Sequence, residues 1–167
     1  MNIILIGMPG AGKSTIGVIL AKTLGMDFLD SDLVICKETG KTLQEILDGD
    51  GLDAFLRIEE DITCSLSPKN TVIATGGSVP MSQRAMTHLK SLGTVVYLQV
   101  SLEELERRLS NITTRGIAFG PGENLHTLYE KRVPIYEAWA DKTVHADPNR
   151  NDLEAMVEQI VDVIHRA

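Results

Sequence analysis

The sequence predicts an α/β domain in which helices cover both faces of a short parallel sheet. Short apolar runs alternate with longer amphipathic stretches along the chain, and this alternation is typical of β-α-β units. The first apolar run, residues 2–6, is mostly Ile and Leu and ends at a glycine, as expected of a buried central strand. A length of 167 residues without a linker, repeat or low-complexity tract indicates one domain, residues 1–167.

Five segments are expected to be strands of this sheet. Residues 2–6, 71–75 and 94–99 are the stronger candidates, and the last two are rich in β-branched residues between turn residues. Residues 27–30 and 142–145 are weaker candidates with the same flanking pattern. The spacing between these runs leaves room for a helix after each strand.

Helices and one irregular loop are expected between the strands. Residues 13–24 and 153–165 carry apolar side chains at helical spacing. Residues 42–45 (Thr-Leu-Gln-Glu) and 101–104 (Ser-Leu-Glu-Glu) have the pattern of capping boxes, in which a hydroxyl and a carboxylate satisfy free amides of a first turn. Residues 111–123 are rich in Thr, Gly and Asn, and long irregular loops inside compact domains are commonly lids or binding loops.

The charge balance narrows the class of partner. The chain has 23 acidic and 16 basic residues, so its net charge is −7. Because nucleic-acid backbones select basic faces, we expect no nucleic-acid partner. The N-terminal apolar run has no basic flank and is too short for a signal peptide or a membrane span, so we expect a cytoplasmic protein with no membrane partner. We also expect a monomer.

Residues 7–14 read Gly-Met-Pro-Gly-Ala-Gly-Lys-Ser and match the phosphate-binding loop pattern in full. The context is also right, because an apolar strand precedes the loop and an amphipathic helix follows it. Glycines let successive backbone N–H groups turn toward a phosphate, Lys13 places a cation on the β- and γ-phosphates, and the Ser14 hydroxyl reaches Mg²⁺. The motif predicts ATP binding by Gly10, Ala11, Gly12, Lys13, Ser14 and Thr15.

Four further segments follow this loop in a recognisable order. They are Asp-Ser-Asp at 30–32, Ala-Thr-Gly-Gly at 74–77, Arg115 in the irregular loop, and Arg-Val-Pro-Ile-Tyr at 132–136. In order and spacing the chain resembles the shikimate kinase family over nearly its whole length. The resemblance implies a three-layer α/β/α P-loop NTPase fold with a five-stranded parallel sheet, a helical substrate-binding insert at about 31–60 and a lid at about 111–123. It also implies phosphoryl transfer from Mg-ATP to a hydroxyl of a small, carboxylated metabolite.

The two aspartates have separate expected roles. Asp30 is expected to hold Mg²⁺ together with Ser14, and Asp32 to accept hydrogen bonds from the substrate and act as general base. The alternative is that both residues only cap a helix. Gly76 and Gly77 would let the backbone approach the substrate closely, or they are a plain turn.

The arginines have expected roles and alternatives. Arg132 is expected to bind a substrate carboxylate through two parallel hydrogen bonds, unless it forms a surface ion pair with a neighbouring glutamate. Arg115 is expected to neutralise charge on the transferred phosphoryl group as the lid closes. By the resemblance Arg108 stacks near the adenine; the alternative is a solvated helix face.

Three departures from the family pattern bear on the substrate. The family has Phe-Arg-x-x-Glu where this chain reads Phe-Leu-Arg-Ile-Glu at 55–59, so Leu56 stands at a carboxylate-binding arginine. Arg57 is adjacent and is the candidate to replace it, although one helical residue is a rotation of about 100°. Ser78 replaces a third glycine, and the lid reads Arg-Gly-Ile-Ala at 115–118 in place of Arg-Pro-Leu-Leu.

These departures leave several functions open. The acceptor is shikimate itself or another small molecule such as a polyol, a hydroxy acid or an amino-acid alcohol. A nucleoside monophosphate kinase needs more arginines around its acceptor than this chain offers. A nucleotide-binding module without catalysis is the remaining alternative, although Asp30, Asp32 and Arg115 are all present.

Overall fold

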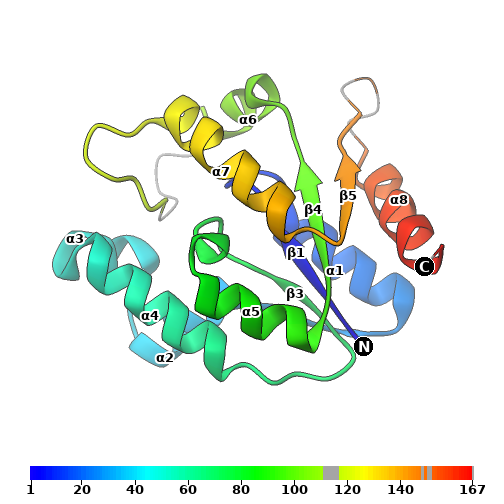
Figure 1. Cartoon of the computed structure of the whole chain (residues 1–167), viewed down its shortest axis with the longest axis horizontal. Helices are drawn as coiled ribbons and strands as arrows, with labels where there is room; N and C mark the ends of the chain where they lie inside the picture. The colour runs from blue at the N-terminus through cyan, green and yellow to red at the C-terminus, as the bar shows by residue number, and fades with distance from the viewer. Residues whose placement is uncertain (111–116, 148, 150–151, 167) are drawn as a thin grey trace.

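The computed structural model describes residues 1–110, 117–147, 149 and 152–166, and its centre is a parallel sheet (Figure 1). The five strands lie in the order β2-β3-β1-β4-β5. The predicted strands are confirmed with shifts of one residue at two ends: β1 Asn2–Ile6, β2 Asp27–Asp30, β3 Thr71–Ala74, β4 Gly93–Gln99 and β5 Lys142–His145.

Strand β1 is the centre of the sheet, and all five of its residues are buried. It pairs with β3 on one side, where Ile4 lies opposite Ile73, and with β4 on the other, where Ile4 lies opposite Val95. The strands are parallel, so their carboxyl ends meet at one edge. The loops that follow β1, β2 and β3 therefore converge, and they carry the predicted site residues.

Helices cover both faces of the sheet, as predicted. Helices α1 (Lys13–Leu24) and α8 (Leu153–His165) pack together on one face, whereas α5 (Gln83–Leu92) and α7 (Leu125–Trp139) lie on the other (Figure 1). A short 3₁₀ helix, η1 (Val79–Met81), connects β3 to α5 and contacts α7. The three layers enclose the main apolar core.

Three helices between β2 and β3 form a separate flank of the molecule (Figure 1). They are α2 (Ser31–Thr39), α3 (Leu43–Asp50) and α4 (Leu52–Ser65), and they occupy the segment predicted as an insert. Their inward side chains form a second apolar cluster of Ile35, Ile46, Phe55 and Ala118, against which Leu56 packs. Ala118 belongs to the segment predicted as a lid, so this cluster joins the insert to the lid.

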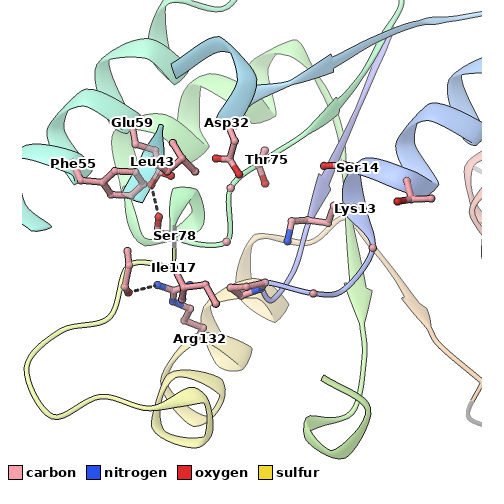
Figure 2. A pocket seen from close by; sticks show the side chains of 17 residues that line it. Lys13, Ser14, Asp32, Leu43, Phe55, Glu59, Thr75, Ser78, Ile117 and Arg132 are labelled. Carbon is pink, nitrogen blue, oxygen red and sulfur yellow. Dashed lines mark hydrogen bonds between the residues drawn. The ribbon is translucent and has the colours of Figure 1, made fainter. Parts of the chain in front are cut away.

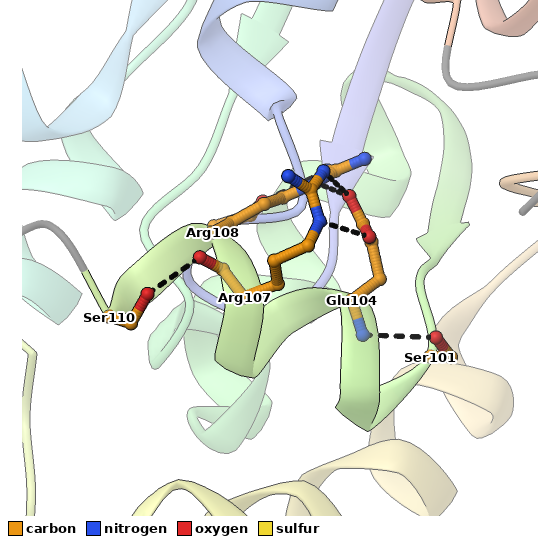
Figure 3. A network of polar contacts seen from close by, with 6 residues as sticks. Ser101, Glu104, Arg107, Arg108 and Ser110 are labelled. Carbon is orange, nitrogen blue, oxygen red and sulfur yellow. Dashed lines mark hydrogen bonds and ion pairs between the residues drawn. The ribbon is translucent and has the colours of Figure 1, made fainter.

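The capping predictions are confirmed to different extents. Thr42 and Glu45 form both hydrogen bonds of a capping box at the start of α3. At the start of α6 (Leu102–Leu109), Ser101 Oγ accepts a bond from the Glu104 backbone N–H at 3.3 Å. The Glu104 carboxylate forms ion pairs with Arg107 and Arg108 (Figure 3). These pairs hold the two arginines on the same side of α6.

The described part of the predicted lid is irregular, and the helices are short or polar. Residues 117–123 form neither helix nor strand, as predicted for the lid; residues 111–116, including Arg115, lie outside the described residues. Within the described residues, every helix is too short or too polar to cross a lipid bilayer.

Candidate active site

The loop between β1 and α1 has the geometry of a phosphate cradle. Gly10 and Gly12 have φ angles of 84° and 92°, which residues with a side chain rarely adopt. Helix α1 begins at Lys13, so its first amides point toward the loop. Lys13 is 7% exposed, and its Nζ donates to the carbonyls of Gly7 and Met8 at 2.8 Å each. Its ammonium group therefore lies over the loop that would surround the β- and γ-phosphates.

Ser14 and Asp30, the two predicted Mg²⁺ ligands, are in direct contact. Ser14 Oγ donates to Asp30 Oδ2 at 2.6 Å. The other oxygen, Asp30 Oδ1, accepts from the backbone N–H groups of Asp32 and Leu33 and so caps α2. Magnesium in phosphotransferases is commonly held by one or two protein oxygens together with substrate phosphates, and this hydroxyl–carboxylate pair fits that requirement. The capping alternative is thus true of Asp30, and the predicted Mg²⁺ role would use the other oxygen, which contacts Ser14.

A pocket opens beside the P-loop, and Figure 2 shows the side chains that line it. Its polar lining brings together Lys13, Asp32, Glu59, Ser78 and Arg132 from five separate segments of the chain. We call this space the acceptor pocket. The lining is completed by the P-loop, by Thr75, Gly76 and Gly77, and by the apolar residues Leu43, Phe55, Ile117 and Ala118.

Gly76 brings two carboxylates together at the end of β3. A Cβ atom at this position would lie 2.7 Å from Asp32 Oδ1 and 2.8 Å from Glu59 Oε2. Any side chain here would therefore collide with both carboxylates, which explains the glycine. The Gly76 backbone N–H donates to Ser31 Oγ at 3.1 Å, which fixes the strand end against α2.

Glu59 is the polar pocket residue that sequence reasoning missed. It is 3% exposed, and its Oε1 accepts a hydrogen bond from Ser78 Oγ at 2.5 Å. The pKa of Glu59 is raised to about 7, mainly by burial and also by the charge of Asp32, while the Ser78 hydrogen bond and the charge of Arg132 act to lower it. Two signals in the sequence could have found it: it is the glutamate of the family pattern at 55–59, and its spacing of four residues from Phe55 places both side chains on one face of α4.

Arg132 is held inside the molecule by the lid segment. It is 3% exposed, and its Nη2 donates to the Ala118 carbonyl at 3.1 Å (Figure 2). The alternative of a surface ion pair is therefore wrong. Its Nε is buried and has no hydrogen-bond partner among the described residues. One turn further along α7, Tyr136 Oη donates to the Gly77 carbonyl at 2.7 Å and ties the helix to the strand end.

Of the remaining predicted site residues, some line the acceptor pocket and others lie outside it. Thr15, Gly76 and Gly77 line the acceptor pocket. Arg57 does not line it and is exposed, because two helical positions separate it from Glu59 and turn it to the opposite side of α4. Arg108 reaches the P-loop from α6: its Nη1 donates to the Gly10 carbonyl at 3.1 Å and its Nε to Glu104 at 2.8 Å.

The arrangement matches a known family along almost the entire chain. The family model for shikimate kinase matches residues 9–165. The chain belongs to the shikimate kinase family. This membership makes it an ATP-dependent small-molecule kinase, and it agrees with a P-loop placed beside a pocket with an aspartate and a buried arginine.

Individual members of the shikimate kinase family are similar over the same length. The shikimate kinase of Haemophilus influenzae (strain PittEE) is 40% identical over 167 residues, which cover 98% of this chain and 92% of that protein. The shikimate kinase of Mycobacterium bovis (strain BCG / Pasteur 1173P2) is 39% identical, with 95% and 90% covered. The similarity therefore extends through the insert helices and the lid as well as the P-loop.

Solved structures support the same family. A shikimate kinase from Acinetobacter baumannii in complex with shikimate is 33% identical and superposes with a TM-score of 0.90, covering 99% of this chain and 93% of its own. A sugar kinase from Janibacter sp. HTCC2649 covers 96% of this chain with a TM-score of 0.58 at 16% identity, and it shares the fold alone.

Proposed function

We propose that this enzyme transfers the γ-phosphoryl group of ATP to a hydroxyl group of shikimate, with Mg²⁺ bound between Ser14 and Asp30. The observation that carries the proposal is the acceptor pocket, in which a buried arginine and an aspartate lie beside the P-loop lysine. The full-length similarity to shikimate kinases, one of them solved with shikimate, supports this acceptor.

The residues of the pocket divide the work of binding and transfer. The Arg132 guanidinium holds the acceptor carboxylate, and Asp32 receives a hydroxyl of the acceptor. The hydroxyl oxygen attacks the γ-phosphorus, the bond between that phosphorus and the ADP oxygen breaks, and the hydroxyl proton passes to Asp32. Lys13 neutralises charge on the β- and γ-phosphates. Arg115 of the lid, which lies outside the described residues, is assigned to the transferred phosphoryl group.

The nucleotide side of the site is assigned to the P-loop. The backbone from Gly10 to Thr15 is assigned to the phosphates, and Arg108, whose Nη1 donates to the Gly10 carbonyl, is assigned to the adenine. When bound, Mg²⁺ would neutralise charge on the phosphates. Ser14 and Asp30 are the protein oxygens that would hold it, since they already meet at 2.6 Å.

A coupled assay of ADP release tests the proposed function. Purified enzyme with Mg-ATP is supplied with shikimate and, separately, with a panel of polyols, hydroxy acids and amino-acid alcohols. We expect shikimate to give the highest kcat/KM and Lys13→Ala to abolish transfer. If shikimate is inert and another acceptor is turned over, the assignment of the substrate is wrong. If ATP binds but none of the panel accepts phosphate, the chain is a binding module without this catalysis.

A different acceptor is the second candidate, and the position of Leu56 favours it. Leu56 packs against the second apolar cluster, so the insert offers no arginine to the pocket at this position. One lost charge-assisted hydrogen bond weakens shikimate binding by about 10–150-fold. A Leu56→Arg variant should then gain shikimate affinity, whereas Leu56→Gln, which adds polarity without charge, should not. If Leu56→Arg gains nothing, Leu56 does not separate this enzyme from its relatives.

The assembly and location of the enzyme belong to the same proposal. A monomer suffices because every residue assigned above comes from one chain. Light scattering after gel filtration tests the monomer, and cell fractionation tests the cytoplasmic location expected from the sequence.

A further inference from the structure

We propose that Glu59 and Ser78 form a charge-setting pair in the acceptor pocket. Ser78 holds the Glu59 carboxyl group beside Arg132 and Asp32, and the proton on this carboxyl group decides whether Arg132 is available to an acceptor carboxylate. The inference rests on the proposed function, because it concerns an acceptor that carries a carboxylate. It gives the pocket a specificity-determining residue that contacts neither ATP nor the P-loop.

The geometry of Glu59 directs one oxygen to Ser78 and leaves the other toward the pocket. Glu59 Oε1 accepts from Ser78 Oγ at 2.5 Å. Oε2 is buried, has no hydrogen-bond partner among the described residues, and lies beside Gly76 (Figure 2). Buried carboxylate oxygens are nearly always hydrogen-bonded, so an unpartnered one in a pocket wall indicates a bound proton or a ligand.

The charged groups around Glu59 come from three directions. Asp32 faces it from the start of α2, Arg132 and the neutral Tyr136 from α7, and Lys13 from across the pocket. The charged residues of α3 are exposed. On α5, the basic residue that faces α4 is Arg84. It forms ion pairs with Glu60 and Asp61 on the solvent side of α4. Among the described residues, Arg132 is therefore the cation whose charge favours the ionised form of Glu59 over the protonated form.

Charge balance then connects Glu59 to the acceptor. An ionised Glu59 offsets part of the positive charge of Arg132, so an incoming carboxylate is attracted less strongly. A protonated Glu59 leaves the full positive charge of Arg132 to that carboxylate. Because burial raises the pKa of Glu59 to about 7, both forms exist near neutral pH. An anionic acceptor should therefore bind more tightly below this pH, and an uncharged acceptor should not respond.

Ser78 positions the carboxyl group and sets the balance between its two forms. Its hydroxyl donates to Glu59, which lowers the pKa of this glutamate against the effect of burial. Leu56 lies three residues before Glu59 on α4, close enough for a basic side chain at 56 to reach it. In this chain that position is apolar and the serine supplies the polar contact.

Calorimetric titration of shikimate and of its methyl ester tests the pair. In the wild type, we expect the Kd for shikimate to rise about tenfold from about pH 6 to about pH 8, which is the size expected when one charged contact is weakened. The Kd for the uncharged ester should change little over the same range. Glu59→Gln should remove this pH dependence. Ser78→Ala should move it to higher pH by about one unit, because a hydrogen bond to the ionised form is lost.

Ser82→Ala is the matched control. Ser82 Oγ donates to Glu60, the next residue of α4, and Glu60 does not line the pocket. The control should leave the pH dependence of shikimate binding unchanged. A flat Kd profile for wild-type shikimate, or equal profiles for shikimate and its ester, would overturn the charge-setting pair.

A second measurement needs no acceptor and separates this inference from the proposed function. The carboxyl carbon of Glu59, followed by NMR in the free enzyme, should titrate near pH 7 in the wild type and at higher pH in Ser78→Ala. If this shift is seen but shikimate neither binds nor reacts, the proposed substrate fails and the positioning by Ser78 stands. If Glu59 titrates at the same pH in both proteins, the inference about Ser78 is wrong whatever the substrate.

Discussion

Ser14 Oγ and Asp30 Oδ2 lie 2.6 Å apart and join the start of α1 to the end of β2. The second oxygen of the same carboxylate caps α2 through the Asp32 and Leu33 amides. One side chain thus orients the Ser14 hydroxyl, which is the proposed Mg²⁺ ligand, and fixes the start of the helix that carries Asp32. Substitutions at Asp30 can separate these two functions.

Asp30→Asn keeps a good helix cap and removes the charge. Asn and Asp are similar as N-caps, so the melting temperature should change little. Transfer should nevertheless fall sharply, and raised Mg²⁺ should restore part of it. Asp30→Ala loses the cap as well and should cost a further 0.5–2 kcal/mol or so in the free energy of unfolding. Chemical denaturation beside the ADP assay measures both; equal stability of the two variants would show that the cap contributes nothing.

Asp32→Asn separates binding from proton transfer. The side chain has the same shape, but it cannot accept the hydroxyl proton, so kcat should drop by about 100-fold or more. The Kd for Mg-ATP should stay within about twofold of the wild type, because Asp32 lies on the acceptor side of the pocket. A collapse of ATP affinity in this variant would place Asp32 on the nucleotide instead.

Arg132→Lys keeps a positive charge but loses the planar fork and the hydrogen bond to the Ala118 carbonyl. We expect the Kd for shikimate to rise by about 10–150-fold, as for one or more lost charge-assisted hydrogen bonds. Lys131→Ala is the control: Lys131 is exposed, pairs with Glu123, and should leave shikimate binding unchanged. A loss of affinity in Lys131→Ala without one in Arg132→Lys would mean that net charge, and not the guanidinium of Arg132, governs binding.

The stability of the protein should depend on pH through Glu59. Burial raises the pKa of this group from 4.5 to about 7, so the folded protein holds a proton that the unfolded chain loses between these values. This contribution is fully present below pH 4.5 and is lost as the pH rises through about 7.

Glu59→Gln has no such proton to lose. We compare the free energy of unfolding of Glu59→Gln with that of the wild type. As the pH rises from 4.5 to about 7, the difference should change by about 3 kcal/mol in favour of the variant. Urea denaturation of both proteins at several pH values measures the difference. A difference that stays constant with pH would show that the carboxyl group titrates normally.

The fold and the nucleotide half of the site could be predicted because their signals are local in the sequence. The P-loop pattern fixes a strand, a turn and a helix within one short segment, and glycine is required where φ is positive. The five strands stood out as apolar runs, and the structure moved two of their ends by a single residue. The contact between Ser14 and Asp30 follows from the parallel sheet, since the loops after β1 and β2 open at the same edge.

The acceptor half was less predictable because it depends on how α4 is rotated. Glu59 and Glu60 are neighbours of the same type, yet Glu59 enters the pocket and Glu60 pairs with Arg84 outside it. A rotation of about 100° separates them, and its direction is set by the packing of α4 against α2, α3, α5 and η1. The same rotation turns Arg57 to solvent. Arg132 was identified correctly as a pocket residue, but its bond to Ala118 joins segments whose sequences give no sign of contact.

The bond from Arg132 to the Ala118 carbonyl connects the position of the proposed carboxylate-binding guanidinium to the backbone of the proposed lid. A backbone carbonyl accepts this bond whatever side chain stands at 118, so lid sequences can vary while the contact persists. Changes in lid length or conformation, by contrast, would move the carbonyl and re-aim the guanidinium. By linkage, any acceptor that binds more tightly when the lid holds Arg132 must also favour that lid position. Descendants of this enzyme could therefore acquire new acceptors through insertions in the lid, without any change to Arg132 itself.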